Sequence, residues 1–298
     1  ELSQNEPVHE YNAEADVLSA DLIQPLKETI RARARVKLPK HGHYQFKKAS
    51  PFRFEGIISY HSGYTQVAGH PSSKSDGFAT LVTSVLEGLN VLDVVTADRV
   101  VAQISTVHPY FGKGQVPSVT FLGTRFENLR IGGHKVEVTR NLEILGSRPS
   151  ESDSYFKDAG VQSRITTQYN NIANDTNLPL WGAKEFPKGP LAVKGNDELN
   201  CSLVDGVTGP EGKPFGQDGV AGLPGTPFGH VIDVPHFGRI YLGELKVTRE
   251  PSPNPKKEAD KYRFRLTMIR LQMGCIAQGS ASAVAADTNG RGGKGGGG

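Results

Sequence analysis

The stretch that decides the fold is Gly77–Gly133, which reads GFATLVTSVLEGLNVLDVVTADRVVAQISTVHPYFGKGQVPSVTFLGTRFENLRIGG. It holds the longest apolar, β-branched run of the chain, and Val, Ile and Thr are residues that favour strands. Phe78–Leu86 is continuously apolar or small, which predicts a strand buried on both faces, although the four-residue spacing of Leu81, Val85 and Leu89 also fits a helix. We favour the strand because Thr and Val dominate.

Other short apolar runs with period-two alternation predict further strands along the chain. The expected strands are Arg31–Leu38, Phe52–Tyr60, Tyr64–Ala68, Val91–Val95, Val100–Val107, Val116–Leu122, Lys135–Leu145, His230–Val234, Arg239–Val247 and Tyr262–Met273. A short helix is expected over Gly160–Asn174, where apolar residues recur at helical spacing. With 35 Gly and 19 Pro supplying turns, the pattern predicts an all-β fold, an antiparallel β-sandwich of jelly-roll-like type with long loops and an extended N-terminal arm.

The strand expected at Arg31–Leu38 has two different faces. Its sequence RARARVKL places Arg and Lys at every second position, and Ala, Val or Leu between them. One face is therefore wholly basic and solvated, and a row of like charges suits the edge of a sheet.

The polar N-terminal stretch, residues 1–30, lacks a core pattern and is interpreted as an arm. Residues 31–286 are expected to form a single large β-domain, with irregular insertions at 146–189 and 206–229, and residues 287–298 a Gly-rich tail. The insertion at 206–229 carries glycines at collagen-like three-residue spacing, interrupted once, so it predicts an extended surface loop or a segment packed on another subunit.

The composition limits the partners. A net charge of +3 over 65 charged groups gives no sign of nucleic-acid binding, and the chain has no apolar run long enough for a membrane helix. The chain begins at Glu1 without Met, as a mature exported protein or a trimmed chain would. We therefore expect a secreted protein, extracellular or at the cell surface, whose two cysteines, Cys201 and Cys275, form a disulfide. Two buried free thiols are the alternative.

Few residues carry recognisable chemistry. No nucleophile elbow, zinc-protease, P-loop or dinucleotide motif is present, so we predict no catalytic residue and no cofactor. His230, Asp233 and His236 form H-x-x-D-x-x-H, a weak metal candidate, because on a strand the Asp points away from the two His. The acidic residues Glu87, Asp93 and Asp98 flank the central strands and are weak candidates for hydrolysis.

Three other residues are candidates for binding or modification. Trp181, the only Trp, lies in a predicted loop and either plugs a core edge or forms a stacking platform for a ligand. Asn174 and Asn200 match the glycosylation acceptor pattern.

The segments LEGLNVLDVVTADRVVAQIST, SVTFLGTRFENLRIGGHKV, VPHFGRIYLGELKV and LTMIRLQMGC resemble secreted bacterial β-proteins, some of the choice-of-anchor type. The resemblance covers about half of the chain and implies export and a sandwich-like surface protein. It brings no catalytic residues, and the collagen-like insertion is not a feature of that class.

From these observations we predict a structural subunit of an extracellular filament or surface assembly, and not an enzyme. The expected partner is a second copy of the chain, in a homo-oligomer or polymer. Strand addition by the arm would link the copies through its spaced apolar residues Leu2, Val8, Tyr11, Val17 and Leu18. The alternatives are a secreted carbohydrate-binding or adhesive module that stacks a glycan on Trp181, and a secreted hydrolase.

Overall fold

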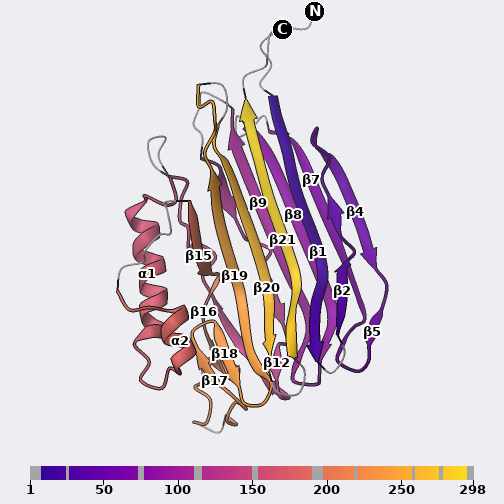
Figure 1. Cartoon of the computed structure of the whole chain (residues 1–298), viewed down its shortest axis with the longest axis vertical. Coiled ribbons are helices and arrows are strands. Elements are labelled where there is room, and N and C mark those ends of the chain that lie inside the picture. The colour runs from indigo at the N-terminus through magenta and orange to yellow at the C-terminus, as the bar shows by residue number, and fades with distance from the viewer. Residues whose placement is uncertain are drawn as a thin grey trace, which may run out of the picture.

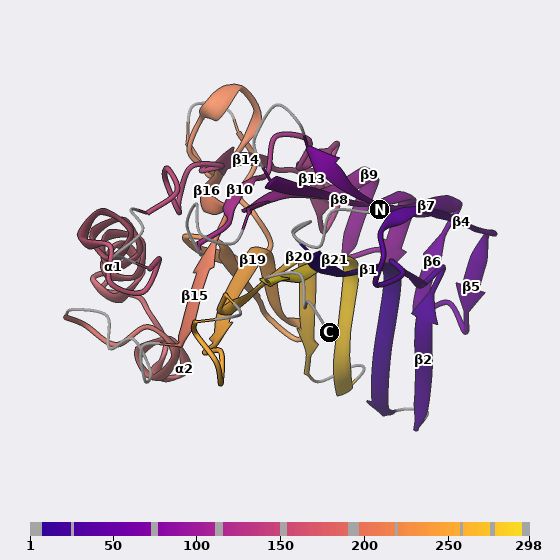
Figure 2. The same ribbon diagram turned by 90° about the horizontal axis from the view of Figure 1, so that it is seen from above.

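Two large antiparallel sheets face each other and form a β-sandwich, with a pair of helices beside one end of it (Figures 1 and 2). The computed structural model describes residues 8–24, 27–72, 77–110, 116–149, 154–189, 197–217, 220–256, 259–274 and 278–293. The predicted all-β sandwich is confirmed.

Sheet A contains both ends of the described chain. Its strand order is β17-β18-β19-β20-β21-β1-β2, with β15 also paired to β19 and β3 to β1. The bounds are β1 Val8–Gln24, β2 Glu28–Arg33, β3 Val36–Lys37, β15 Glu198–Ser202, β17 Thr226–Phe228, β18 Val231–Val234, β19 Gly238–Glu250, β20 Lys261–Met273 and β21 Gln278–Gly293.

Sheet B is built from the middle of the chain. Its order is β13-β12-β9-β8-β6-β5; β10 and β11 pair with β9, and β7 lies between β8 and β4. The bounds are β4 His43–Ala49, β5 Phe52–Phe54, β6 Ile58–Tyr60, β7 Ser62–Ser72, β8 Gly77–Val91, β9 Val95–Pro109, β10 Ser118–Thr120, β11 Arg125–Glu127, β12 Arg130–Ile131 and β13 His134–Lys135.

The remaining elements lie outside these two sheets. A small ribbon pairs β14, Glu137–Arg140, with β16, Val204–Thr208. The helices are α1, Ala159–Ala173, and α2, Leu180–Glu185, with a 3₁₀ turn at Pro210–Gly212. The helix expected over Gly160–Asn174 is confirmed by α1, and the expected irregular insertion at 146–189 therefore contains both helices.

The hairpin of β8 and β9 is the centre of sheet B. The neighbouring side chains of Val85 and Leu86 are both fully buried, so β8 is covered on both faces as its apolar run predicts. One detail differs from the expectation. The strand continues through Gly88, which has a φ of +66°, to Val91, and the turn falls at Leu92 and Asp93, which both have positive φ, so the expected separate strand Val91–Val95 is instead the turn of this hairpin.

The N-terminal segment is a core strand, which corrects the prediction of an arm over residues 1–30. β1 pairs with β21 along its whole length, from Val8↔Gly293 to Gln24↔Gln278, and the two strands lie side by side in the middle of sheet A (Figure 1). Residues 287–293 of the expected tail belong to β21.

The residues proposed for assembly are therefore engaged within the chain. The side chains of Tyr11, Val17 and Leu18 are buried in the core of the sandwich, where they cannot reach another subunit. Val8 belongs to β1, and Leu2 lies outside the described residues. Strand addition by these residues would require β1 to leave its own sheet.

Polar contacts join the two sheets across the core. The Ser84 hydroxyl on β8 donates to the backbone carbonyl of Asp16 on β1 (2.7 Å). The hydroxyls of Thr106 on β9 and Thr288 on β21 lie 3.4 Å apart. Each of these groups would be costly to bury alone, so the contacts favour one alignment of the two sheets.

Two imidazole rings lie inside the sandwich, one from each sheet. His9 of β1 stacks on Phe78, with 4.6 Å between ring centroids, and lies 5.0 Å from the ring of His108 of β9. Both are buried, and their ring nitrogens have no hydrogen-bond partner in the described part of the chain. Burial lowers the pKa of His9 to about 4 and, together with His9, that of His108 to about 3.

These imidazoles should make the protein sensitive to acid. Between pH 6.5 and about 4 the unfolded chain binds protons that the folded chain excludes, so the free energy of unfolding falls as the pH falls. Replacing His108→Gln should reduce this slope by up to about 1.4 kcal/mol per pH unit, measured by urea unfolding from pH 7 to pH 4.5.

Comparing this variant with the unmodified chain cancels the contributions of the other titrating groups to the slope. One of these groups is Asp16, whose pKa is raised to about 6 by burial. His41→Gln is the matched control, because that imidazole is exposed to solvent in the folded protein. An unchanged slope in His108→Gln would contradict the assignment.

Candidate functional site

A groove of about 300 Å³ opens on the outer face of sheet A, where the strands β15, β19 and β20 meet the helices. We call it the outer groove. It is lined by Tyr169, Glu185, Phe186, Asn200, Cys201, His230, Tyr241, Glu244, Leu245, Lys246, Arg265, Thr267 and Arg270.

Helix α1 forms one side of the groove because its sequence caps and buries it there. The carboxylate of Asp158 accepts a hydrogen bond from the backbone N–H of Val161 (2.8 Å), which is the usual N-cap arrangement. Val161, Ile165 and Ile172 recur at helical spacing and are buried. Tyr169, between them, reaches the groove, and its hydroxyl donates to the backbone carbonyl of Asn200 (3.1 Å).

Gln168 attaches α1 to the strand side of the groove. This buried amide donates to the backbone carbonyl of Ser202 (3.0 Å) and to the carboxylate of Asp205 (2.9 Å). Its oxygen accepts from the backbone N–H of Ser202 (2.9 Å). The side chain thus satisfies both backbone groups of one residue in β15, and it fixes the distance between helix and sheet.

A chain of charged and aromatic side chains begins beside the groove and continues into it. The guanidinium of Arg239 lies over the ring of Trp181, 4.6 Å from its centroid, and donates to Glu185 (2.8 Å). Both oxygens of Glu185 accept from the hydroxyl of Tyr241 (2.9 and 3.1 Å). The Tyr241 ring in turn lies 3.6 Å from the guanidinium of Arg270.

The chain ends in a paired carboxylate. Arg270 of β20 donates twice to Glu244 of β19, at 2.6 and 2.8 Å, in the two-point geometry that favours Arg over Lys. Glu185 and Glu244 are each partly exposed, at 38% and 28%, so a ligand in the groove can reach them. Burial, and then the charge of Glu185, raise the pKa of Tyr241, which keeps its hydroxyl a hydrogen-bond donor.

Two buried groups lie at the back of the groove. Burial, with the nearby positive charge of Arg270, lowers the pKa of His230 to about 4, and the Nδ1 atom of that ring has no partner in the described part of the chain. Burial raises the pKa of the Cys201 thiol to about 12, so this thiol stays protonated and unreactive at neutral pH. At neutral pH the imidazole of His230 is therefore uncharged and the thiol of Cys201 is protonated. These are not the forms that general-acid catalysis by a histidine or nucleophilic attack by a cysteine requires.

The structure separates the members of the predicted metal motif. His230 is buried beside the groove, the carboxylate of Asp233 accepts from the indole N–H of Trp181 (3.1 Å), and His236 is exposed. In the described part of the chain, no three His, Cys, Asp or Glu side chains gather as metal ligands would. The H-x-x-D-x-x-H spacing therefore does not bring its residues to one site.

Trp181 lies on α2 next to the groove, and it contacts the protein on more than one side. Its ring meets Phe228 edge-on at 6.0 Å and is covered by Arg239 on one face. It supports the charged chain through Arg239, and that face is not open to a stacked ligand.

The cysteine and glycosylation predictions have different outcomes. Cys201 is a free, buried thiol, and Cys275 lies outside the described residues, so the disulfide stays a prediction. Asn174 and Asn200 are both exposed, and Asn200 lines the outer groove. A glycan on Asn200 would occupy the mouth of the groove.

The acidic residues considered for hydrolysis are each held by a neighbour in sheet B. Glu87 accepts from the hydroxyl of Ser62, Asp98 from the amide of Asn128 (3.0 Å), and Asp93 from Asn90 (2.6 Å).

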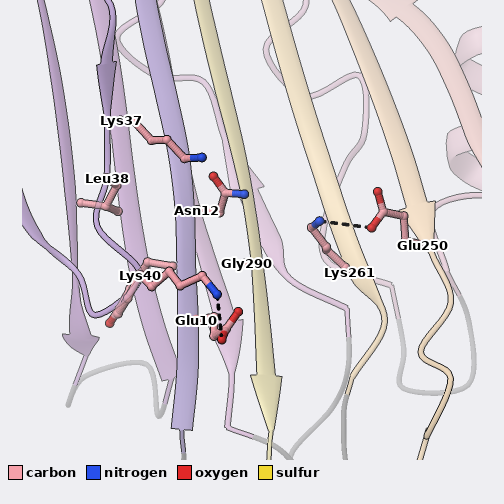
Figure 3. A pocket seen from close by; sticks show the side chains of 9 residues that line it. Glu10, Asn12, Lys37, Leu38, Lys40, Glu250, Lys261 and Gly290 are labelled. Atoms are coloured by element: carbon pink, nitrogen blue, oxygen red, sulfur yellow. Dashed lines mark hydrogen bonds and ion pairs between the residues drawn. The ribbon is translucent and has the colours of Figure 1, made fainter.

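A second cavity, of about 250 Å³, lies on the same face of sheet A and is lined by residues of β1, β3, β19, β20 and β21 (Figure 3). Lys40 pairs with Glu10 (3.4 Å) and Lys261 with Glu250 (3.1 Å), while Lys37 extends over Asn12. Because β19 and β20 also line the outer groove, the two cavities lie at different positions along the same strands.

The fold and the groove define an all-β sandwich with a helical flank and a ligand-sized groove between flank and sheet. A family model described as Domain of unknown function (DUF8256) matches residues 9–248, and the chain belongs to this family. That span contains every residue of the outer groove except Arg265, Thr267 and Arg270 on β20.

No curated protein and no solved structure matches the chain. The family model carries no link to choice-of-anchor proteins, so that resemblance stays a prediction. Among the helices in the described part of the chain, none has the length and apolar character that crossing a bilayer requires.

The attachment of α1 can be tested at Gln168. Replacing Gln168→Ala should leave two backbone groups of Ser202 buried without partners, lowering the free energy of unfolding by about 2–4 kcal/mol in chemical denaturation. Gln66→Ala is the matched control, because its amide makes one 3.4 Å bond, to Thr83, and should cost less than about 1 kcal/mol. Equal costs for the two variants would contradict this role of Gln168.

Proposed function

We propose that the protein binds a neutral carbohydrate in the outer groove. The observation that carries the proposal is a continuous chain of contacts that begins beside the groove at Trp181 and Arg239. It continues into the groove, where its members Glu185, Tyr241, Arg270 and Glu244 line the wall. It presents carboxylates, guanidinium groups and aromatic rings together, in an arrangement that their mutual contacts hold rigid.

The chemistry of these groups suits hydroxyl-rich ligands. A sugar hydroxyl donates to a carboxylate and accepts from a guanidinium, and Glu244 and Arg270 offer both within one pair. The rings of Tyr169 and Phe186, 5.2 Å apart at the helical side, add apolar area for the faces of a sugar. The two carboxylates are balanced by Arg239 and Arg270, and the lining cations Lys246 and Arg265 pair with Glu198 and Asp287 outside the groove. This balance favours a ligand without charge.

Binding is favoured over catalysis for a physical reason. Both carboxylates are committed to short ion pairs, and His230 and Cys201 have the wrong charge for acid or nucleophilic chemistry at neutral pH. We keep the secreted location as part of this proposal, since an extracellular protein would meet polysaccharides directly.

The test uses the full-length chain on a glycan array, followed by titration calorimetry with the glycans that bind. Replacing Arg270→Ala should weaken binding about 10- to 100-fold, because it removes one charged donor and releases Glu244 from its geometry. Arg125→Ala is the matched control, since Arg125 makes a comparable pair with Glu127 (2.7 Å) on sheet B and should leave affinity unchanged.

Circular dichroism would confirm that both variants fold. Absence of glycan binding, or equal loss in both variants, would overturn the proposal. Release of reducing sugar from a bound glycan would show a hydrolase instead.

A second candidate function is the structural subunit predicted from the sequence, and one observation favours it. Strand β4 pairs only with β7 among the described strands, and its side chains are exposed, including Tyr44 at 58% and Phe46 at 43%. The exposed aromatic side chains of this edge strand favour strand addition by another copy, while Lys47 and Lys48 on the same strand oppose it. In this form of the hypothesis β4, and not the N-terminal segment, forms the interface.

Negative-stain microscopy of the full-length protein tests this candidate. The unmodified chain should form oligomers or filaments, and Tyr44→Lys with Phe46→Lys should leave monomers, because charges on an edge strand oppose pairing. Ile23→Lys with Leu122→Lys is the control, since those apolar side chains are exposed elsewhere, at 62% and 81%. Monodisperse monomers of the unmodified chain would rule the candidate out.

A further inference from the structure

The positive charge of the chain is concentrated in one region. Residues 27–61 carry nine Lys and Arg against two acidic residues, a net charge of +7, whereas the whole chain has +3. The remaining residues therefore have a net negative charge. We call the cationic side chains of this region the basic edge: Lys27, Arg31, Arg33, Arg35, Lys37, Lys40, Lys47, Lys48 and Arg53, all exposed.

The fold places these side chains on the strands that end the two sheets. β2 is the last strand of sheet A, and β4 and β5 lie on the same side of sheet B, away from the helices (Figures 1 and 2). The alternation predicted for Arg31–Leu38 is kept through a bend at Ala34, whose φ is +47°. The hydroxyl of Thr65 on β7 donates to the carbonyl of Ala34 (2.6 Å) and fixes this bend against sheet B.

Few of these cations are neutralised within the chain. Arg35 pairs with Glu14 (2.7 Å) and Lys40 with Glu10 (3.4 Å), both at the surface. Arg31, Lys37 and Lys47 make no ion pair in the described part of the chain. Like charges held side by side without counter-charges repel one another, and a polyanion would relieve this repulsion.

The shape of the basic edge distinguishes between polyanions. Along Lys27–Lys37 the apolar side chains of Ile30 and Val36 point inward and are buried, and every large exposed side chain is polar or charged. A membrane-binding surface needs apolar groups among its cations, and single-stranded nucleic acid needs open aromatic faces. Beside this row the ring of Phe52 is covered by Arg33 at 4.5 Å. The exposed rings of Tyr44 and Phe46 lie on β4, so this argument against membranes and single-stranded nucleic acid applies to the row Lys27–Lys37 and not to β4.

The row continues onto the outer face of sheet A. Lys37 and Lys40 both line the cavity of Figure 3, together with Asn12 and Lys261. The carboxylates of Glu10 and Glu250 also line it and pair with Lys40 and Lys261, which leaves Lys37 as the lining cation without an ion pair in the described part of the chain. A linear ligand that follows β2 and β3 would therefore enter this cavity. Its acidic groups would meet guanidinium and ammonium donors on the strand edge, and its hydroxyls would meet Asn12.

We propose that the basic edge binds a linear acidic polysaccharide that carries sulfate or carboxylate groups. This site is separate from the outer groove, because its cationic row lies on β2 and β3 while the groove lies over β15, β19 and β20, and because the two ligands differ in charge. The guanidinium groups of Arg31, Arg33 and Arg35 match the oxygens of sulfate and carboxylate in two-point geometry.

The experiment measures affinity of the full-length protein for heparin and for polygalacturonate at several salt concentrations. Replacing Arg31→Gln together with Lys37→Gln should weaken binding at least 10-fold and make it less sensitive to salt, because fewer counterions are released. Lys184→Gln with Lys188→Gln removes the same charge from exposed positions at the helical end, and it should change affinity less than twofold.

Three outcomes would overturn the proposal. They are absence of binding to both polysaccharides, equal losses in the two double variants, and tighter binding to duplex DNA or to phosphatidylserine vesicles than to either polysaccharide at equal charge. Binding of the unmodified chain to neutral dextran would point to the outer groove, so failure of one site is distinguishable from failure of the other.

Discussion

The pairing of β1 with β21 is the constraint on which the rest of the structure depends. It joins the two ends of the described chain in the middle of sheet A, so neither half of that sheet is complete without the other. Everything between them, including all of sheet B, lies within the loop that this pairing closes. Pairing between segments so far apart in the sequence has a high entropy cost and is typically slow to form. The cross-sheet bond of Ser84 to the Asp16 carbonyl then ties sheet B to the closed sheet A.

The same closure creates the surface on which both proposed sites lie. Once β1 and β21 join, the outer face of sheet A runs without interruption from β15 at the helices to β3 at the edge. Charged side chains on neighbouring strands pair across this face, as Arg263 does with Asp287 (2.7 Å) and Arg270 with Glu244. Pairs of this kind add little stability at a surface, but they fix side chains that would otherwise be mobile. The outer groove arises where the helices interrupt this face and shield one pair from solvent.

The sequence predicted what local patterns determine. Three predictions rest on patterns within one short segment each, and the structure confirms all three. They are the buried strand at the apolar run of β8, the basic alternation of Arg31–Leu38 and the helix at the periodic residues of α1. The sequence did not predict β1 or β21, because their inward side chains are mostly small. Ala13, Ala15, Ala283 and Ala286 are buried, but alanine gives a weak apolar signal, and such a strand is recognisable only beside its partner.

The groove was missed for a related reason, since its residues come from five separate elements, α1, α2, β15, β19 and β20, and share no spacing. Glu244 and Arg270 occupy outward positions of strands that the sequence does predict, but their pairing depends on the register of β19 with β20. That register is constant, with Leu242↔Ile269 and Glu244↔Thr267 on either side of Gly243, but Gly243 has a φ of +62°. The alternation of outward positions breaks there in both strands, so that Glu244 and Thr267 on one side of the break and Tyr241 and Arg270 on the other all line the groove. Without this break Arg270 would project from the other face of the sheet, and the chain of contacts from Trp181 to Glu244 would be broken. A single irregularity in two otherwise regular strands thus decides whether Glu244 and Arg270 both line the groove. The regular alternation expected from the sequence cannot reveal this irregularity.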